Sequence, residues 1–401
     1  MTPDPAQLLA GLDAEQRHAV EHEATLLAIV APAGSGKTRT LTRRIAYLSA
    51  VERIEPRRVL AVTFTRKAAG ELRSRLGGPL GCGDVTAGTF HSLALGQLRR
   101  RSADAGRTFP ALLERKARIL GPLVGGRGAQ STVAINEFAG EIEWAKARAL
   151  TPEQYADAAE RSGRPLPRPA SELAAMYERY ELEKRRRKLI DFDDLLWWCA
   201  DALERDPDFA AATRFRFRHL FVDEFQDVTP AQLRVLRAWL GPRRDLTVVG
   251  DEAQAIYAFA GAQPGALTNF DRLFPGAVVV RLATNYRSTP QIVAVADAVL
   301  DADSGAARQR PRAPRERGPA PRVSAYDDAA AEASAVAAAA RRVHERGLRV
   351  IQVYGSTETC PIATYVRAEN ADRKAGAAGP PALHCEVRVV DAADNDVPQG
   401  Q

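Results

Sequence analysis

Cysteine is scarce and scattered in this sequence. The 401 residues include four, Cys82, Cys199, Cys360 and Cys385, and no two of them form a CxxC pair. Disulfide frameworks and zinc sites need cysteines at close, repeated spacings. The sequence therefore favours neither, and a reducing cytosol is the expected compartment.

Long apolar runs are also missing. No run approaches the roughly 20 apolar residues that a membrane-spanning helix needs. The start, Met1–Pro5, has no basic stretch leading into an apolar one, as a secretory signal would have. We therefore expect a soluble, cytoplasmic protein with no membrane partner.

Neither sign of charge is in large excess. The formal net charge is +6, which suits a polyanionic partner such as nucleic acid. A soluble basic protein from an arginine-rich proteome would show the same balance. Charge alone does not choose between these two interpretations.

The chain does have short apolar segments that alternate with helical stretches. Five of these segments predict buried strands: Leu26–Val30, Val59–Phe64, His219–Asp223, Leu246–Gly250 and Val278–Leu282. Such strands, separated by helices, are typical of an α/β fold with a parallel sheet covered on both faces. From about Gly96 to Ile190 the strand pattern stops, and periodicity such as that of Glu172–Lys188 predicts a helical insertion.

A phosphate-binding loop follows the first predicted strand. Its residues are Ala31, Pro32, Ala33, Gly34, Ser35, Gly36, Lys37 and Thr38, and Arg39 continues into a helical stretch. In such loops backbone N–H groups and a helix N-terminus hold phosphates. Lys37 would reach the β- and γ-phosphates, and the Thr38 hydroxyl would bind Mg²⁺. A chance glycine-rich turn is the alternative, and the flanking strand and helix argue against it.

Two carboxylates end a later strand. Asp223 and Glu224 open the run Asp-Glu-Phe-Gln-Asp. A carboxylate at the end of a buried strand is costly unless it serves a cation, so Asp223 is predicted to hold Mg²⁺. Glu224 can polarise an attacking water as a general base. An exposed acidic turn is the alternative, but beside a phosphate loop the pair indicates a nucleoside triphosphatase.

Further blocks occur in order along the chain: Leu12–Gln16, Ala61–Ala69, Gly88–Ser92, Asp191–Leu195, Val249–Phe259 and Asn285–Ser288. With the two motifs above, they resemble the UvrD/Rep/PcrA family of superfamily 1 DNA helicases from about Leu12 to Ala340. The resemblance implies a RecA-like P-loop NTPase core and ATP-dependent 3′-to-5′ translocation. ATP and Mg²⁺ are the implied cofactors, and single-stranded DNA and duplex junctions are the implied partners. The oligomeric state stays open.

The resemblance implies roles for residues around the nucleotide. Gln16 would bond the edge of adenine, and Tyr286 would stack on it. Gln254 would sense the γ-phosphate, and Arg287 would reach it. Hydrolysis is then expected to depend on five residues: Lys37, Asp223, Glu224, Gln254 and Arg287.

The resemblance also implies DNA contacts from five residues: Phe64, Thr65, His91, Tyr257 and Phe259. Rings would stack on bases and the Thr65 hydroxyl would bind phosphate, a sequence-tolerant way to hold a strand. The family usually has Trp where Phe259 stands, so we expect weaker stacking there. Taken singly, such aromatics are more often core residues, and His91 would be a structural histidine.

The resemblance divides the chain as well. Residues 1–95 and 191–280 would form the first RecA-like domain, residues 96–190 the helical insertion, and residues 281–347 the start of a second RecA-like domain. The later motifs of that domain, including a second arginine for the ATP site, are not found. We therefore expect a truncated second domain and an ATPase that is weak or inactive.

From about residue 348 the sequence changes character. Val350–Thr359 resembles the adenylate-binding block of AMP-forming acyl-CoA synthetases, and Leu383–Gln399 resembles the strand and turn that follow it. The phosphate loop, hinge and catalytic lysine of those enzymes are absent, so no adenylation is expected. Our hypothesis is a fusion of two gene fragments near Gly347–Val350, and a diverged second helicase domain is the alternative.

Two functions stay open on the sequence. The first is an ATP-dependent DNA helicase impaired by truncation. The second is a nucleotide-dependent module that binds single-stranded DNA without unwinding it. The pathway, whether repair, replication restart or plasmid replication, is not indicated.

Overall fold

The computed structural model describes residues 4–125, 128–258, 261–263, 265–304 and 310–347, with two short strands at 353–354 and 364–365. The chain divides into two compact units, residues 1–320 and residues 321–401. Each unit is described by itself.

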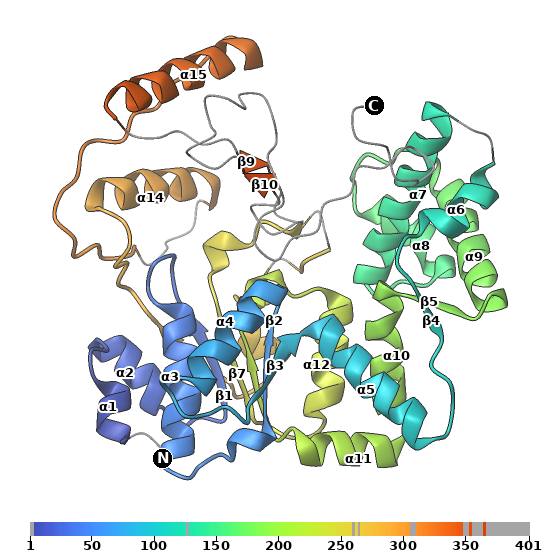
Figure 1. The fold of residues 1–401 in the computed structure, drawn as a ribbon, viewed down its shortest axis with the longest axis horizontal. Coiled ribbons are helices and arrows are strands. Elements are labelled where there is room, and N and C mark those ends of the chain that lie inside the picture. Colours follow the sequence, from blue (N-terminus) through green and yellow to red (C-terminus); the bar gives the residue numbers. More distant parts are fainter. Residues whose placement is uncertain are drawn as a thin grey trace. The chain divides into compact units, whose positions relative to one another are not determined.

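A parallel six-stranded sheet forms the centre of the first unit (Figure 1). Its strands are β1 (Leu26–Val30), β2 (Val59–Thr63), β3 (Thr86–Thr89), β6 (His219–Val222), β7 (Leu246–Gly250) and β8 (Val278–Arg281), in the spatial order β3-β2-β6-β7-β1-β8. The predicted α/β fold with a parallel sheet is confirmed, and three of the five predicted strands end one residue early. The sequence does not predict β3, because its residues Thr-Ala-Gly-Thr form no apolar run.

Helices cover both faces of the sheet (Figure 1). One face carries α3 (Lys37–Ala50) and α4 (Arg66–Gly77), and the other carries α5 (Phe90–Asp104), α10 (Phe192–Arg205) and α12 (Pro230–Leu240). Successive strand residues point to opposite faces. Leu27 and Ile29 therefore join the apolar core on the α3 side. Leu26 and Ala28 join the core on the other side, with Phe90.

Smaller elements complete the first unit. They are α1 (Pro5–Leu9), α2 (Ala14–Glu21), η1 (Pro56–Arg58), α11 (Pro207–Arg216), η2 (Phe225–Asp227), η3 (Glu252–Gln254), α13 (Phe270–Leu273) and α14 (Pro290–Ser304). The helix α2 begins with a capping box in which Asp13 and Gln16 exchange hydrogen bonds. This box fixes the start of the helix that lies beside the phosphate loop.

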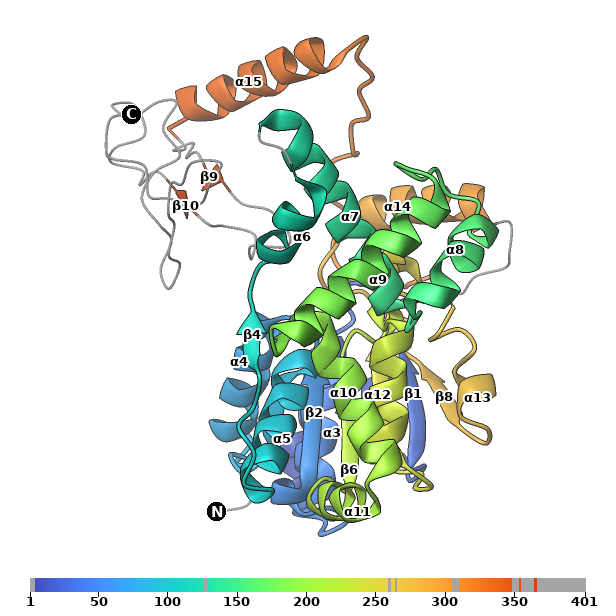
Figure 2. The ribbon, with the colours of Figure 1, turned by 90° about the vertical axis from the view of Figure 1, so that its right-hand side faces the viewer.

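A helical subdomain is inserted between α5 and α10 (Figure 2). It contains β4 (Ala111–Leu113), α6 (Ala117–Val124), α7 (Ala129–Ala147), α8 (Pro152–Arg161), α9 (Ala170–Arg186) and β5 (Leu189–Asp191). It has its own apolar core, which includes Tyr155, Leu173 and Tyr180. The stretch expected to be free of strands holds two short ones, β4 and β5, paired in parallel. The domain division itself stays a prediction, and α5 continues past residue 96 to pack against α10.

The second unit contains α15 (Ala329–Glu345), on which no residue is buried, and the antiparallel pair β9 (Val353–Tyr354) and β10 (Thr364–Tyr365). Most of the predicted Val350–Thr359 block, and all of Leu383–Gln399, lie outside the described residues. In the described part of the chain, no helix has the length and apolar character needed to cross a bilayer.

Candidate active site

The phosphate loop joins β1 to α3 at the carboxyl edge of the sheet. Gly36 adopts a left-handed conformation with φ of 82°, and α3 begins at the next residue, Lys37. The N–H and the hydroxyl of Ser35 both donate to the Pro32 carbonyl, at 3.2 and 2.7 Å. The first N–H groups of an α-helix have no partner within the helix. The start of α3 therefore offers donors where the sequence predicts phosphates.

Lys37 and Thr38 meet acidic side chains from the ends of two neighbouring strands. Lys37 Nζ lies 3.8 Å from Oδ2 of Asp251, which follows β7. The Thr38 hydroxyl donates to Oδ2 of Asp223, which follows β6, at 3.2 Å. Lys37, Asp223 and Asp251 are all buried. Strands β6, β7 and β1 thus converge on the first turn of α3.

Three carboxylates crowd the end of β6. Burial and then the charge of Glu224 raise the pKa of Asp223 to about 6. The same two causes raise the pKa of Asp227 to about 7. Among the residues described, Asp227 Oδ1 is a buried oxygen with no hydrogen-bond partner.

This crowding fits a divalent cation. Buried carboxylates that repel one another are stabilised when they share a cation, and Mg²⁺ takes oxygen ligands. Thr38 and Asp223 are the residues that would hold it, and Asp227 and Glu224 lie close enough to add negative potential. The donor set therefore agrees with the Mg²⁺ that the sequence predicts, while the ligand roles stay a prediction.

Glu224 has a strained backbone. Its φ of 52° and ψ of 42° lie in the left-handed region, which is costly for any residue with a Cβ. Its N–H donates to Asp223 Oδ1 at 3.0 Å, and its carboxylate accepts from the Gln226 side chain at 3.0 Å. Such strain persists only where the surroundings enforce it. The surrounding contacts therefore fix the position of the predicted general base.

Gln226 connects the ends of β6 and β7. Its Oε1 accepts the Asp251 N–H at 3.0 Å. A Cβ on Gly250 would lie 2.5 Å from that oxygen, so the close approach requires glycine there. Gln226 thereby sets the spacing between the two strand ends that carry Asp223 and Asp251.

Gln254 contacts the same carboxylate as Lys37. Its Nε2 donates to Asp251 Oδ2 at 2.6 Å, and that oxygen is the one nearest to Lys37 Nζ. Asp251 therefore links the phosphate-binding lysine to η3. Sensing of a γ-phosphate by Gln254 stays a prediction.

The segment after β8 packs on the phosphate loop. The Tyr286 N–H donates to the Gly34 carbonyl at 2.9 Å. A Cβ on Gly34 would lie 2.5 Å from Asn285 Oδ1 and 2.7 Å from Arg287 Cβ. The Tyr286 hydroxyl donates to Asp13, and the residue is 43% exposed. Tyr286 and Arg287 therefore lie beside the loop, and the adenine and γ-phosphate roles expected of them stay predictions.

Gln16 is occupied by contacts within the protein. Its Oε1 accepts the Asp13 N–H at 3.3 Å, and its Nε2 donates to the Ser35 carbonyl at 2.8 Å. Gln16 is only 2% exposed. The structure places this side chain as a support for the phosphate loop, and its contact with adenine stays a prediction. Arg39 donates to the Gly11 carbonyl at 3.0 Å, next to the same block.

Two residues predicted to contact DNA follow β2. Phe64 is half-buried and packs edge-to-face on Phe90 at 5.7 Å. Thr65 is exposed and caps α4 by accepting the Ala68 N–H at 3.1 Å. Phe64 therefore has the packing of a core aromatic, with part of its ring accessible.

The other predicted DNA contacts lie in three places. His91, on α5, is half-buried, and burial lowers its pKa; the charge of Asp193 acts the other way. Tyr257 is half-buried in the segment after η3. Phe259 lies outside the described residues. DNA binding by these residues stays a prediction.

Sequence reasoning assigns no role to four residues of the site: Gln226, Asp227, Asp251 and Asn285. Asp251 ends an apolar strand just as Asp223 does, and that shared pattern is the signal that could identify it. No comparable signal exists for Gln226 or Asn285, because their contacts depend on close approach to glycines.

A comparison with protein families gives a match near the end of the chain. The family described as AMP-binding enzyme matches residues 254–401. The match begins upstream of residue 348, where the sequence changes character, and it overlaps the helicase-like blocks. The predicted likeness of the tail to AMP-forming enzymes is thus found, with a boundary that differs from the expected one.

Curated relatives match most of this chain. It is 46% identical over 358 residues to ATP-dependent DNA helicase UvrD2 of Mycobacterium tuberculosis (strain ATCC 25618 / H37Rv), covering 85% of this chain and 51% of the relative. It is 36% identical over 326 residues to UvrD1 of the same strain, covering 77% and 42%. It is 36% identical over 304 residues to PcrA of Leuconostoc citreum, covering 73% and 39%. The chain spans about half the length of the curated relatives it matches, or less.

The site and the sequence comparisons lead to the same family. The family described as UvrD/REP helicase N-terminal domain matches residues 12–275, which include the phosphate loop, the carboxylates after β6 and the Asp251–Gln254 contact. Most of the central sheet lies in this stretch. The chain belongs to the UvrD/REP helicase family.

Proposed function

We propose that this chain is the ATP-binding part of a DNA helicase that moves 3′ to 5′ along single-stranded DNA. The observation that carries the proposal is the convergence of β6 and β7 on the first turn of α3. The Thr38 hydroxyl donates to Asp223 at 3.2 Å, and Asp251 contacts both Lys37 and Gln254. A Mg·ATP site requires contacts of this kind. Relatives named as ATP-dependent DNA helicases support the reaction.

The chain's own residues would divide the work of hydrolysis. The N-terminus of α3 and Lys37 would hold the phosphates, with Thr38 and Asp223 at the cation. Mg²⁺ held by these two residues would supply positive charge that offsets the negative charge of the phosphates. Glu224, held by its neighbours in a fixed conformation, would orient and deprotonate the attacking water.

We further propose that this chain by itself hydrolyses ATP slowly and does not unwind duplex DNA. An arginine supplied from across the cleft can be worth about 10³-fold or more in rate. Arg287 lies beside the phosphate loop, and no later helicase motif is found in the sequence. The site would then bind nucleotide well but lack part of its charge stabilisation.

The test is ATP hydrolysis with and without single-stranded DNA, alongside nucleotide binding. We expect tight Mg·ATP binding that Lys37→Ala weakens at least tenfold, and slow turnover that Glu224→Gln lowers about 100-fold. Glu252→Gln is the matched control, because Glu252 follows Asp251 as Glu224 follows Asp223, and it should change turnover little.

Failure to bind nucleotide would contradict the whole proposal. Turnover at ordinary helicase rates, abolished by Lys37→Ala, would contradict only the slow-hydrolysis part. DNA affinity that responds to ATP while turnover stays absent would favour the alternative, a nucleotide-dependent DNA-binding module.

A further inference from the structure

A short segment rich in proline and arginine, residues 310–315, packs on the turn that carries Arg287. It belongs to no helix or strand. The Arg312 N–H donates to the Ala283 carbonyl at 2.6 Å, and the Arg312 carbonyl accepts the Asn285 N–H at 2.7 Å. The segment therefore lies beside the chain that leaves β8 for the phosphate loop.

The Arg312 side chain is attached to the first turn of α2. Its guanidinium pairs with one carboxylate oxygen of Glu15, and the other oxygen of Glu15 accepts the Ala283 N–H at 2.6 Å. Glu15 thus holds both of the chains that Arg312 joins. The Arg312 side chain is 68% exposed, and an ion pair this exposed adds little to the free energy of unfolding. Its effect is therefore on position more than on stability.

Arg315 holds the turn itself. Its Nη1 donates to the Arg287 carbonyl at 2.6 Å. The Arg287 N–H donates to the side-chain oxygen of Asn285 at 2.9 Å, and the Ser288 N–H donates to the same oxygen at 2.9 Å. Both backbone polar groups of Arg287 therefore have partners.

Two prolines stiffen the segment. Pro311 precedes Arg312, and Pro314 precedes Arg315. A proline ring fixes one backbone dihedral angle and leaves the unfolded chain fewer conformations to lose. The two arginines are therefore held against the turn at a small cost in conformational entropy.

The side chain of Arg287 is exposed, and it forms no ion pair within the part of the chain that the structure describes. Its base touches the phosphate loop, since a Cβ on Gly34 would lie 2.7 Å from the Arg287 Cβ. A guanidinium without a carboxylate partner readily binds the oxygens of a phosphate. The anion expected at this loop is the γ-phosphate of ATP.

We propose that Glu15, Arg312 and Arg315 are positioning residues that hold Arg287 where it contacts the γ-phosphate. The inference rests on the proposed function. Among the described residues, the hydrogen bonds of these three side chains go to one another, to Ala283 and to Arg287, and none goes to the phosphate loop. A fixed backbone lowers the cost of ordering the Arg287 side chain on the phosphate, which strengthens that contact.

The test compares binding of ADP and of a non-hydrolysable ATP analogue, each with Mg²⁺, to the full 401-residue chain. The ratio of the two dissociation constants measures the preference for a γ-phosphate. Arg287→Ala should lower this preference about tenfold, as expected for the loss of one charged hydrogen bond. Arg312→Ala with Arg315→Ala should lower it at least threefold and leave the affinity for ADP within twofold of the parent.

A double-mutant cycle tests whether the two arginines act through Arg287. In a chain that already carries Arg287→Ala, adding Arg312→Ala and Arg315→Ala should change the preference by less than about twofold. Arg310→Ala is the matched control. Arg310 lies in the same segment but pairs with Asp301 of α14 at 2.7 Å, so its loss should leave the preference as in the parent.

A milder variant tests the attachment to α2. Glu15→Gln keeps an acceptor for the Ala283 N–H and removes the charge that pairs with Arg312. It should lower the preference as much as Arg312→Ala alone does. Arg312→Lys, which keeps the charge, should retain part of the preference that Arg312→Ala loses.

The outcomes separate the inference from the function on which it rests. A parent chain that binds neither ADP nor the analogue would overturn the proposed function. A parent chain that binds both, with Arg287→Ala lowering the preference and Arg312→Ala with Arg315→Ala leaving it unchanged, would overturn the inference alone. The inference is also wrong if Arg287→Ala has no effect, if Arg310→Ala acts equally, or if the variants weaken ADP and the analogue to the same extent.

Discussion

At the scale of single residues, the end of β6 holds more negative charge than its burial favours. The charge of Glu224 acts on both Asp223 and Asp227, and the charge of Lys37 partly offsets it. Sites that bind a metal commonly carry such a cost without it. Ionisation of these groups should therefore lower the free energy of unfolding, whereas ionisation of an ordinary paired carboxylate raises it.

Asp227 gives the test. Its pKa is raised to about 7 in the folded chain, against about 4 for an unfolded aspartate. Between these values the folded state binds more protons than the unfolded state, so the free energy of unfolding should fall as pH rises from about 4 to about 7. The loss is about 1 kcal/mol, less than the shift alone would give, because solvent screens a partly exposed carboxyl.

Asp227→Asn should remove that loss. Urea unfolding without Mg²⁺ at several pH values would compare it with Asp157→Asn, an exposed residue of α8 in the helical subdomain. We expect the Asp227→Asn variant to keep more of its stability above neutral pH and the control to follow the parent. Equal pH profiles for all three chains would contradict the argument.

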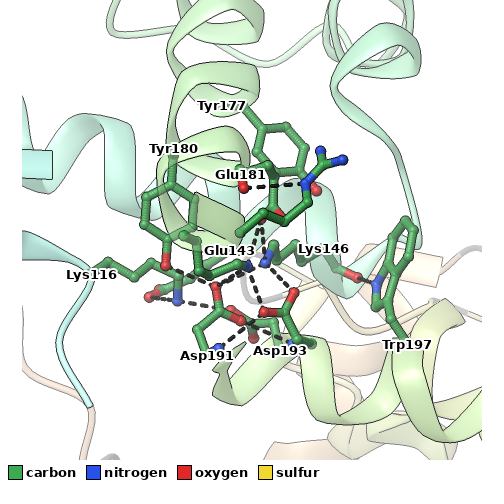
Figure 3. A network of polar contacts seen from close by, with 12 residues as sticks. Lys116, Glu143, Lys146, Tyr177, Tyr180, Glu181, Asp191, Asp193 and Trp197 are labelled. Atoms are coloured by element: carbon green, nitrogen blue, oxygen red, sulfur yellow. Dashed lines mark hydrogen bonds and ion pairs between the residues drawn. The ribbon is translucent and has the colours of Figure 1, made fainter. Parts of the chain in front are cut away.

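At the scale of elements, a buried ionic network joins the helical subdomain to the core (Figure 3). Lys146 and Lys184, from α7 and α9, meet Asp191 and Asp194 at the start of α10, at distances of 2.5 to 2.9 Å. Glu181 and the two aspartates lie close enough to hold a metal ion. The oxygens of these three side chains already pair with the ammonium groups of Lys146 and Lys184. We therefore interpret the network as a connection between secondary-structure elements.

Removing one partner of this ionic network should lower the free energy of unfolding. Lys146→Met removes one of the two ammonium groups that these buried carboxylates share, which costs about 3–5 kcal/mol of unfolding free energy. Adding Asp194→Asn should recover part of the loss, because it removes the negative charge of one of the buried carboxylates that Lys146 had balanced. Arg186→Ala is the control, since its pair with Glu183 lies at the surface and is worth about 0–1 kcal/mol. A double variant as unstable as Lys146→Met would refute the pairing argument.

The elements also indicate how far sequence reasoning reaches. Apolar runs predict five of the six strands of the central sheet, while β3 has too few apolar residues to form a run. The phosphate loop and Asp223 follow from local patterns. Asn285 against Gly34, Arg148 against Ala258, and the Lys146 network join residues far apart in the chain, and no local pattern encodes those contacts.

At the scale of the whole molecule, the described ATP-site residues and the three large apolar cores all lie within residues 1–320. In the second unit α15 buries no residue. The two units should therefore contribute very unequally to nucleotide binding.

A chain ending at residue 320 is expected to bind Mg·ATP within about threefold of the full chain. Its thermal midpoint should fall by no more than a few degrees, because the three large apolar cores lie within residues 1–320. Calorimetry and nucleotide titration of both chains would measure this. A tenfold loss of affinity would instead assign the second unit a part in the site.

The strand order also has a consequence for how the chain folds during synthesis. Strand β1 lies between β7 and β8, and β2 lies between β3 and β6. During synthesis β1 cannot pair with β7 until Leu246–Gly250 has left the ribosome. By then the helical subdomain, which has its own core, has already emerged. Distant pairings of this kind slow folding and leave apolar strands exposed. The inserted helices should therefore fold first, and the emerging N-terminal strands should depend on chaperones until the sheet can close.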